Sequence, residues 1–308
     1  MSTTTAPAHA RPRGRDPVVV DEATAAATIT DGMTVAFGGF INSGHPMAIA
    51  RHLVRNGVKD LTLVGAASAG LDVDLMIAAG CVRKVVTPYV GAEGLAAIGP
   101  AFRWAAEQGA IEVFELDEAH FYAGLRAAAQ RLPFNPWRAG VGTDFPRVNP
   151  ALVEFDCPVS GQRLIAVPAI DLDVAVLHAS ISDAYGNVQH HGTGFGDRAM
   201  YAAADRTVVQ VEQIVANERI RANPQATSVP GADQVVRAPY GAHPFGSQGH
   251  YPPDEAHLRA YVAAATELRK GSRDALDAYL ATYVLGPSDH AAYLEAVGVE
   301  RLLSLSEF

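Results

Sequence analysis

Short apolar runs alternate with helix-like patterns along most of this chain, and the alternation restricts the possible folds strongly. Runs typical of buried strands lie at 33–37, 61–64, 82–86, 111–114, 164–167, 174–178 and 207–211. Helical patterns lie at 47–56, 72–79, 101–108, 118–131, 199–204, 255–269, 273–283 and 289–297. Strands that alternate with helices form βαβ units. The sequence therefore predicts an α/β fold with a mainly parallel sheet, in which ligands bind beyond the carboxyl ends of the strands.

The first of these strands leads into a glycine-rich loop. Gly38 and Gly39 follow the strand at 33–37, and Pro46 stands at the start of the next helical pattern. Glycine lacks Cβ, so the chain can turn with positive φ and a ligand can approach closely. Unpaired N–H groups and the positive end of the helix dipole favour a negatively charged oxygen. The loop is expected either to bind such a group or to make only a tight turn, because turns of this kind are common in α/β folds.

Prolines interrupt the middle of the chain. Pro133, Pro136, Pro146 and Pro150 punctuate a stretch without clear periodicity, and residues 135–161 are expected to form an irregular insertion. Residues 1–16 are rich in Ala, Thr, Pro and Arg and have no apolar core of the length that a signal peptide needs. We expect a disordered tail over 1–16 and a single α/β domain over 17–308.

The composition argues against several classes of protein. The chain has 24 basic and 33 acidic side chains, and its formal net charge of −9 argues against nucleic acid or an anionic membrane as a partner. No run approaches the roughly 18 uninterrupted apolar residues of a membrane span. The two cysteines, Cys81 and Cys157, lie far apart and suggest neither a disulfide framework nor a zinc site. These features predict a reduced, cytoplasmic protein.

Several further polar residues are candidates for a site. The segment 192–197, Gly-Thr-Gly-Phe-Gly-Asp, precedes a helical pattern and is expected to be a structural turn or a ligand-binding loop; its glycine spacing does not fit dinucleotide binding. His190 and His191 are adjacent and would point in different directions on a strand, so no metal site is expected. His243 lies in a turn-rich segment, where it could line a site or simply satisfy nearby carbonyl groups.

The densest acidic cluster lies where a predicted strand gives way to a helix. It comprises Glu115, Asp117 and Glu118. Asp117 can cap the helix by accepting a hydrogen bond from an early N–H, and Glu118 would complement the helix dipole. Clustered carboxylates in a cleft also raise one another's pKa, so Glu118 could instead act as a base. Both interpretations remain open at this stage.

Several separate motifs resemble one protein family. They are Asp31-Gly32 with Gly38-Gly39-Phe40, Gly44 and Pro46; Val167-Pro168-Ala169-Ile170; Asp183-Ala184-Tyr185-Gly186-Asn187; Val229-Pro230-Gly231; and Tyr240-Gly241-Ala242-His243-Pro244. Because these motifs follow one another in the right order over roughly residues 17–270, the chain resembles the A (α) subunit of family I CoA-transferases, in the glutaconate CoA-transferase branch. The resemblance implies an open, mostly parallel sheet with helices on both faces, the CoA-transferase/NagB-like fold.

The resemblance also implies a mechanism and a partner. In such transferases a glutamate of the B (β) subunit first attacks an acyl-CoA, and the resulting glutamyl-CoA thioester passes CoA to a carboxylic acid in a ping-pong exchange. This chain has no match to that glutamate motif, which implies a B (β) subunit, in an α2β2 heterotetramer, with CoA thioesters as substrates and no permanently bound cofactor or metal. The residues expected to line the oxyanion, CoA or substrate pocket are Gly38, Gly39, Phe40, Asn42, Ser43, Gly44, Tyr185, Asn187, Tyr240, Gly241 and His243.

Two other functions are considered. The segments 115–118 and 124–140 resemble the α subunits of CoA-transferase-like hydrolases that open a ring of a steroid-derived CoA thioester, with Glu118 as the catalytic base. Phe40 and the segment 240–244 fit transferases better, which favours CoA transfer. The second alternative is a non-catalytic sensor of a small ligand on a related scaffold. Such regulators carry a DNA-binding domain, for which the tail at 1–16 is too short.

Overall fold

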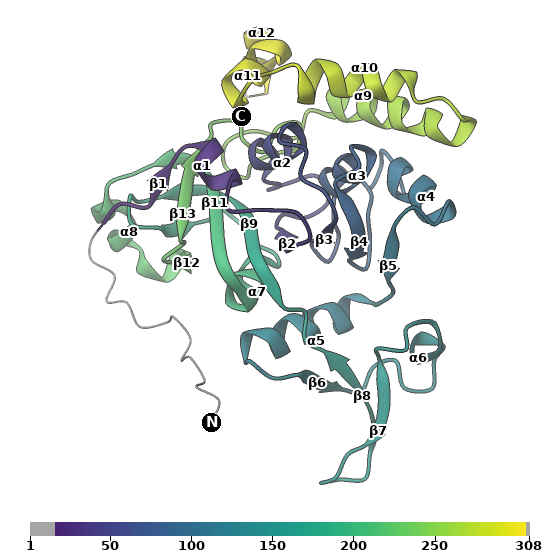
Figure 1. Ribbon diagram of the computed structural model, residues 1–308. Coiled ribbons are helices and arrows are strands. Elements are labelled where there is room, and N and C mark those ends of the chain that lie inside the picture. Colours follow the sequence, from purple (N-terminus) through teal and green to yellow (C-terminus); the bar gives the residue numbers. More distant parts are fainter. Residues whose placement is uncertain (1–15, 306–308) are drawn as a thin grey trace, which may run out of the picture.

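The computed structural model describes residues 16–305, most of which belong to a ten-stranded sheet or to the helices around it (Figure 1). The strands of this sheet are β1 (Val19–Val20), β2 (Thr34–Phe37), β3 (Leu61–Val64), β4 (Val82–Val86), β5 (Glu112–Phe114), β9 (Leu172–Ser182), β10 (Asn187–Gln189), β11 (Ala204–Ile214), β12 (Thr227–Pro230) and β13 (Gln234–Arg237). Eight of them run parallel in the order β1-β13-β11-β9-β2-β3-β4-β5. β10 pairs antiparallel with β9 and β12.

Helices cover both faces of this sheet. The helices within residues 16–305 are α1 (Glu22–Ala26), α2 (Met47–Arg55), α3 (Leu71–Ala78), α4 (Pro100–Glu107), α5 (Glu118–Ala129), α6 (Phe145–Val148), α7 (Asp197–Ala203), α8 (Asn217–Ala222), α9 (Glu255–Thr266), α10 (Asp274–Leu280), α11 (His290–Val297) and α12 (Val299–Ser304), and α6 lies apart from this sheet (Figure 1). Short 3-10 segments lie at Pro224–Ala226 and Glu267–Lys270, and a π-helical turn at Ala281–Leu285. Within residues 16–305, no helix combines the length and apolar character needed to cross a membrane.

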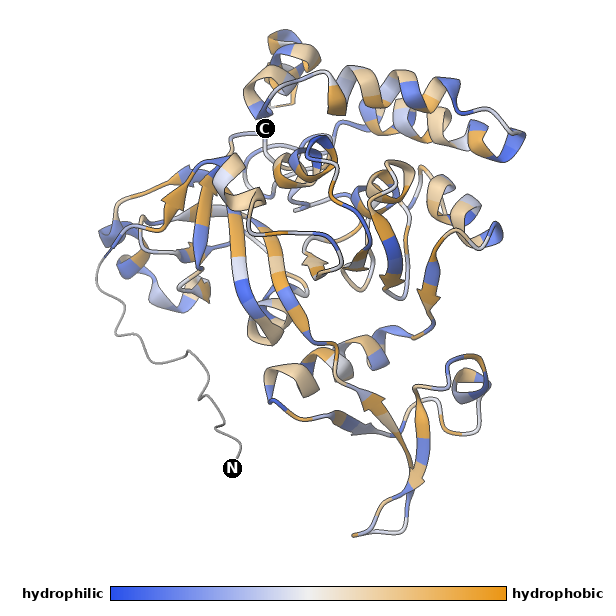
Figure 2. Cartoon of the chain, in the orientation of Figure 1, coloured by the Kyte–Doolittle hydropathy of each residue, from blue (hydrophilic) through white to orange (hydrophobic). Residues whose placement is uncertain are grey.

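Two hydrophobic cores hold these layers together. α2, α3, α4, α9 and α10 contribute to the core on one face of the sheet, and α5 and α7 to the core on the other. Successive residues of β2 point to opposite faces, so Val35 and Phe37 enter the first core and Ala36 the second. Figure 2 shows the matching pattern, with apolar residues along the central strands and polar residues on the outer helices. The predicted α/β fold with helices on both faces is confirmed.

The middle of the chain is more regular than expected. We expected an irregular insertion over 135–161. Parts of this stretch are regular instead, because β6 (Phe134–Trp137) and β7 (Val153–Asp156) pair antiparallel with β8 (Arg163–Pro168) in the order β6-β8-β7. That the stretch is an insertion stays a prediction. Pro136 concealed β6 from the sequence pattern. Proline is tolerated there because β6 is an edge strand, where a missing N–H interrupts no inner ladder. The tail predicted over 1–16 lies, except for Asp16, outside the described residues, and a single domain over 17–308 stays a prediction.

The strand order brings two distant parts of the chain together. β3, β4 and β5 extend from one side of β2, and the chain then crosses back so that β9 pairs with the other side. Phe37, the last residue of β2, lies opposite Val176 of β9. The order therefore reverses between β2 and β9, and in open α/β sheets such a switch point creates a crevice at the carboxyl ends of the strands.

Candidate active site at the switch point of the sheet

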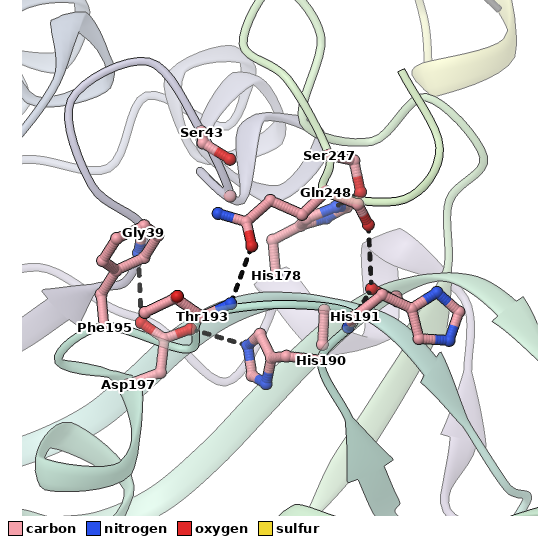
Figure 3. A pocket seen from close by; sticks show the side chains of 13 residues that line it. Gly39, Ser43, His178, His190, His191, Thr193, Phe195, Asp197, Ser247 and Gln248 are labelled. Carbon is pink, nitrogen blue, oxygen red and sulfur yellow. Dashed lines mark hydrogen bonds and ion pairs between the residues drawn. The ribbon is translucent and has the colours of Figure 1, made fainter. Parts of the chain in front are cut away.

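A small pocket lies at this switch point (Figure 3). Four segments line it: the loop after β2, strand β9, the loop that leads from β10 into α7, and the segment before α9. The lining residues are Gly39, Ser43, Gly44, His178, Ala179, Ser180, His190, His191, Thr193, Phe195, Asp197, Ser247 and Gln248. Its free volume is about 20 Å³, which is room for about one water molecule. In this conformation the pocket accepts a small chemical group rather than a whole acyl chain.

The loop at 38–46, called the glycine loop below, requires glycine at its first two positions. Gly39 has φ +101°, a conformation that L side chains rarely adopt, and a Cβ there would lie 2.8 Å from the carbonyl oxygen of Gly44. A Cβ on Gly38 would lie 2.5 Å from Oδ1 of Asp197. Both positions are therefore crowded, by the loop itself and by the residue that begins α7.

The backbone amides of the glycine loop are mostly occupied. Those of Gly38, Phe40, Ile41, Ser43 and Gly44 donate to backbone carbonyl groups at 2.8–3.0 Å. The amide of Gly39 donates to Oδ1 of Asp197 at 3.1 Å. The expectation of unpaired N–H groups is wrong for these six residues, because Phe40 and Ser43 pair with each other and neighbouring segments accept from the other four amides. An oxygen bound in this pocket therefore needs other hydrogen-bond donors.

Asp197 fastens the glycine loop to the loop at 192–197. Its side chain is only 2% exposed, and Oδ2 lies 3.0 Å from Nε2 of His190. The other ring nitrogen of His190, Nδ1, lies 2.6 Å from Oγ of Ser228. The rings of Phe40 and Phe195 stack with centroids 4.6 Å apart, which joins the same two loops a second time. The segment at 192–197 is thus part of the pocket wall.

A buried carboxylate lies behind the opposite wall of the pocket. Glu212 is 5% exposed, and Nε2 of His178 lies 3.2 Å from its Oε1. The hydroxyl of Tyr251 and the amide of Tyr240 each donate to Glu212 at 2.7 Å. Burial alone would raise the pKa of Glu212, but hydrogen bonds from His178, Tyr251 and Tyr240 outweigh burial and lower it. These hydrogen bonds therefore favour the ionised form of Glu212.

The structure separates the residues that the sequence placed in one pocket. Gly39, Ser43 and Gly44 are among the lining residues, whereas Gly38, Phe40 and Asn42 belong to the same loop without lining the pocket. Tyr185 and Asn187 lie outside the lining, in a turn organised by Asp183, whose carboxylate accepts from both of their amides. Tyr240, Gly241 and His243 also lie outside it.

His243 belongs to a buried network at the ends of the C-terminal helices. Its Nδ1 lies 2.6 Å from the hydroxyl of Tyr293, and its Nε2 lies 3.2 Å from Oδ2 of Asp254. Nitrogen and oxygen atoms of His243, Asp254 and His257 lie within 4.8 Å of one another, a spacing that would suit a metal ion. Arg301, however, binds both oxygens of Asp254, and His257 pairs with Tyr279. Because these atoms already have partners, we assign the cluster a structural role.

Glu118 is not among the residues that line the pocket. It is exposed at the first position of α5, and the predicted cap is confirmed, because Asp117 accepts a hydrogen bond from the amide of His120 at 2.7 Å. Burial, and then the carboxylates of Glu118 and Asp197, raise the pKa of Tyr122, so the two acids act on the same phenol.

The sequence did not indicate several of the lining residues. His178, Ser180, Ser247 and Gln248 lie in a strand or a loop without a glycine motif, and no local pattern distinguishes them. His190 and His191 were considered only as metal ligands. They do diverge, because His190 contacts Asp197, whereas the ring of His191 stacks on His250 with centroids 5.5 Å apart.

Comparisons with known proteins indicate the family of the chain. Residues 20–238 match the family described as Coenzyme A transferase. The chain is 35% identical over 289 residues to the cholesterol ring-cleaving hydrolase IpdA subunit of Mycobacterium tuberculosis, covering 90% of this chain and 97% of that one. It is 31% identical over 297 residues to the A subunit of glutaconate CoA-transferase from Acidaminococcus fermentans, covering 90% of each chain.

Two further matches differ in their extent. An uncharacterised protein of Archaeoglobus fulgidus is 38% identical over 278 residues, which are 89% of this chain but only 61% of that protein. The crystal structure of the Acidaminococcus fermentans glutaconate CoA-transferase matches with a TM-score of 0.87 at 30% identity, over 94% of this chain and 96% of that one. The family motifs, the fold and these matches together show that the chain belongs to the coenzyme A transferase family, as a subunit of the A type.

Proposed function

We propose that the chain is the α subunit of a heteromeric, cytoplasmic CoA-transferase that moves CoA from an acyl-CoA to a carboxylic acid. The main support is the glycine loop at the switch point, which lies on a small pocket in a fold that matches glutaconate CoA-transferase closely. Gly38, Gly39 and Phe40 carry the motif that favoured a transferase in the sequence. The two relatives with a stated function are subunits of enzymes, which favours an enzyme over a non-catalytic sensor.

The nucleophile is proposed to come from a β subunit, in an α2β2 complex. A ping-pong exchange through an acyl anhydride and a glutamyl-CoA thioester needs a carboxylate that is free to attack. Among the described lining residues the one carboxylate is Asp197, and its two oxygens are engaged by Gly39 and His190. The small volume of the pocket also favours a site that is completed by a second chain.

Co-expression with the β-type subunit tests this proposal. The purified complex is expected to exchange CoA between acyl-CoA donors, beginning with acetyl-CoA, succinyl-CoA and glutaryl-CoA, and free carboxylic acids, whereas this chain alone is expected to be inactive. Borohydride added after incubation with acyl-CoA should inactivate the complex by reducing a glutamyl thioester in the partner. Activity of this chain alone, or a complex in which borohydride modifies no glutamate, would contradict the proposed mechanism.

The ring-opening hydrolase remains the second candidate, on two observations. The relative from Mycobacterium tuberculosis, at 35% identity, is a ring-cleaving hydrolase subunit. The carboxylate of Glu118, the proposed base of that reaction, raises the pKa of Tyr122, and so does the carboxylate of Asp197, which lines the pocket.

The variant Glu118→Gln distinguishes the two functions. In a transferase whose nucleophile lies in the partner, CoA exchange is expected to stay within about threefold of the unmodified complex, because a general base contributes far more than that where it acts. In a hydrolase that uses Glu118 as its base, the rate is expected to fall about 10²- to 10⁴-fold. Glu115→Gln, which changes an exposed carboxylate nearby, is the control. Hydrolytic ring opening of a cyclic CoA-thioester substrate that ignores added carboxylate and is lost only in Glu118→Gln would overturn the transferase.

A further inference from the structure

The glycine loop uses its amides within the chain, so the donors for a bound oxygen must lie elsewhere in the pocket. Two consecutive residues, Ser247 and Gln248, line the pocket next to that loop. A parallel bridge between Ser43 and Gly246 and a hydrogen bond of 2.8 Å from the amide of Gly44 to the carbonyl of Gly246 hold their segment against the loop. Hydrogen bonds orient both side chains.

The amide of Gln248 has one orientation that satisfies its neighbour. The backbone N–H of Thr193 donates to Oε1 of Gln248 at 2.8 Å, and a donor can only be matched by the oxygen end of the side-chain amide. Nε2 is therefore the end that remains. Figure 3 shows it directed into the space between Ser43 and Thr193, and within residues 16–305 no hydrogen-bond acceptor is found for it. Gln248 thus presents two N–H donors to the pocket.

The hydroxyl of Ser247 is oriented by a longer chain of contacts. The backbone N–H of Ile49 donates to Oε1 of Gln210 at 3.3 Å, which fixes that amide and makes its Nε2 the donor to Nδ1 of His178 at 2.8 Å. A neutral imidazole that accepts at Nδ1 carries its proton on Nε2. His178 therefore donates through Nε2.

Two acceptors share the Nε2 proton of His178. One is Oγ of Ser247 at 2.9 Å, and the other is the buried carboxylate of Glu212 at 3.2 Å. Because Oγ of Ser247 accepts from the imidazole, its own hydrogen is available for another acceptor. Ser247 is 2% exposed and lines the pocket, so that acceptor would be a ligand atom.

We propose that the hydroxyl of Ser247 and the side-chain amide of Gln248 form a donor pair that holds the carbonyl oxygen of a bound CoA thioester and the oxyanion that develops from it. This inference rests on the proposed function and names the donors that the glycine loop lacks. Both donors are neutral, and their orientation is set before a ligand arrives, which is the arrangement that stabilises a developing oxyanion most. Gln210 acts as a positioning residue, because it does not line the pocket and contacts Ser247 only through His178. His178 lines the pocket and orients the hydroxyl of Ser247.

The test uses the complex with the β-type subunit, with the donor and acceptor pair on which the unmodified complex is active. Gln248→Glu keeps an oxygen for the amide of Thr193 and replaces the free N–H donors by a second oxygen. This variant is expected to lower kcat about 100-fold or more with a smaller change in KM, since one such donor contributes about 10²- to 10³-fold. Ser247→Ala is expected to lower kcat to a similar extent. Ser247→Thr, which keeps the hydroxyl, should retain most of the activity.

Binding provides a readout that does not depend on turnover. Calorimetry with the ketone analogue of acetyl-CoA, in which a methylene group replaces the thioester sulfur, should show about tenfold weaker binding for Ser247→Ala and for Gln248→Glu. Ser304→Ala, which removes an exposed hydroxyl of α12, is the matched control and should change neither kcat nor binding. His178→Gln should lower kcat like Ser247→Ala, and in combination with Ser247→Ala it should cause little further loss.

The outcomes separate this inference from the proposed function. An unmodified complex that does not exchange CoA contradicts the proposed function. An active complex whose Ser247→Ala and Gln248→Glu variants keep both kcat and affinity overturns the donor pair alone. If Ser247→Ala fails to assemble with the β subunit, Gln248→Glu decides the matter, because that variant preserves the bond to Thr193.

Discussion

Gly39→Ala is expected to abolish the activity of the complex and to lower the free energy of unfolding of this chain by about 3 kcal/mol. Two costs add at this position. Alanine at φ +101° is strained whatever the space around it, and its Cβ would lie 2.8 Å from the carbonyl oxygen of Gly44 and 2.9 Å from Nδ1 of His45. The loop must therefore open, which moves the amide of Gly39 away from Asp197 and disturbs the pocket. Urea unfolding and CoA exchange measure the two effects.

Gly32 provides a control that carries only one of these costs. It lies just before β2 with φ +80°, and a Cβ there would have no atom within 4 Å. Gly32→Ala is expected to cost about 1 kcal/mol through backbone strain and to leave the activity unchanged. If Gly39→Ala proves as stable and as active as Gly32→Ala, the tight turn of the glycine loop is not required for function.

Asp254→Ala is expected to lower the free energy of unfolding by about 3 kcal/mol at neutral pH. Asp254 is 1% exposed, and its oxygens accept from Arg301, His243 and the amide of His257. Its loss removes the cap of α9, worth about 1 kcal/mol, and charge-assisted hydrogen bonds, worth about 2 kcal/mol. Asp289→Ala, which removes the cap of α11 without an ion pair, is the control and should cost about 1 kcal/mol.

The difference between these two variants should depend on pH. Burial alone would raise the pKa of Asp254, but the hydrogen bonds from Arg301, His243 and His257 outweigh it and hold the pKa well below its usual range. A carboxyl group whose pKa is lowered by folding stabilises the fold above its unfolded pKa of about 3.9, and this stabilisation is lost as the pH falls below that value. Urea unfolding at pH 7 and pH 3 should show the cost of Asp254→Ala shrinking at the lower pH. A cost that is constant or grows at pH 3 would contradict the assignment.

The layered fold could be predicted from the sequence because its signals are local. The runs at 61–64 and 82–86 coincide with β3 and β4, and 47–56 differs from α2 by one residue. Where two signals conflict, the pattern fails. Pro136 concealed an edge strand. β10, β12 and β13 were not predicted, although β12 and β13 are as long as β3.

The candidate site was only partly predictable, because its contacts depend on pairing between distant strands. The glycine loop could be identified from Gly38, Gly39 and Pro46, since glycine and proline have conformational consequences that the sequence carries directly. His178 and Gln210, by contrast, become neighbours only because β9 and β11 pair in one register. His243 was expected in the pocket and lies instead in a buried network, and a turn-rich sequence does not distinguish these two environments.

The pairing of β2 with β9 also has a consequence for how the chain folds. The amide of Thr34 and the carboxylate of Asp173 meet across that pair although 139 residues separate them in the sequence. Contacts of such long range close a large loop before they contribute any stability, and they slow folding. During synthesis the glycine loop would leave the ribosome long before β9, His178 and Asp197 exist to hold it. Until β9 is synthesised, the edge of β2 that later pairs with it stays unpaired. An unpaired strand edge exposes the nascent chain to aggregation.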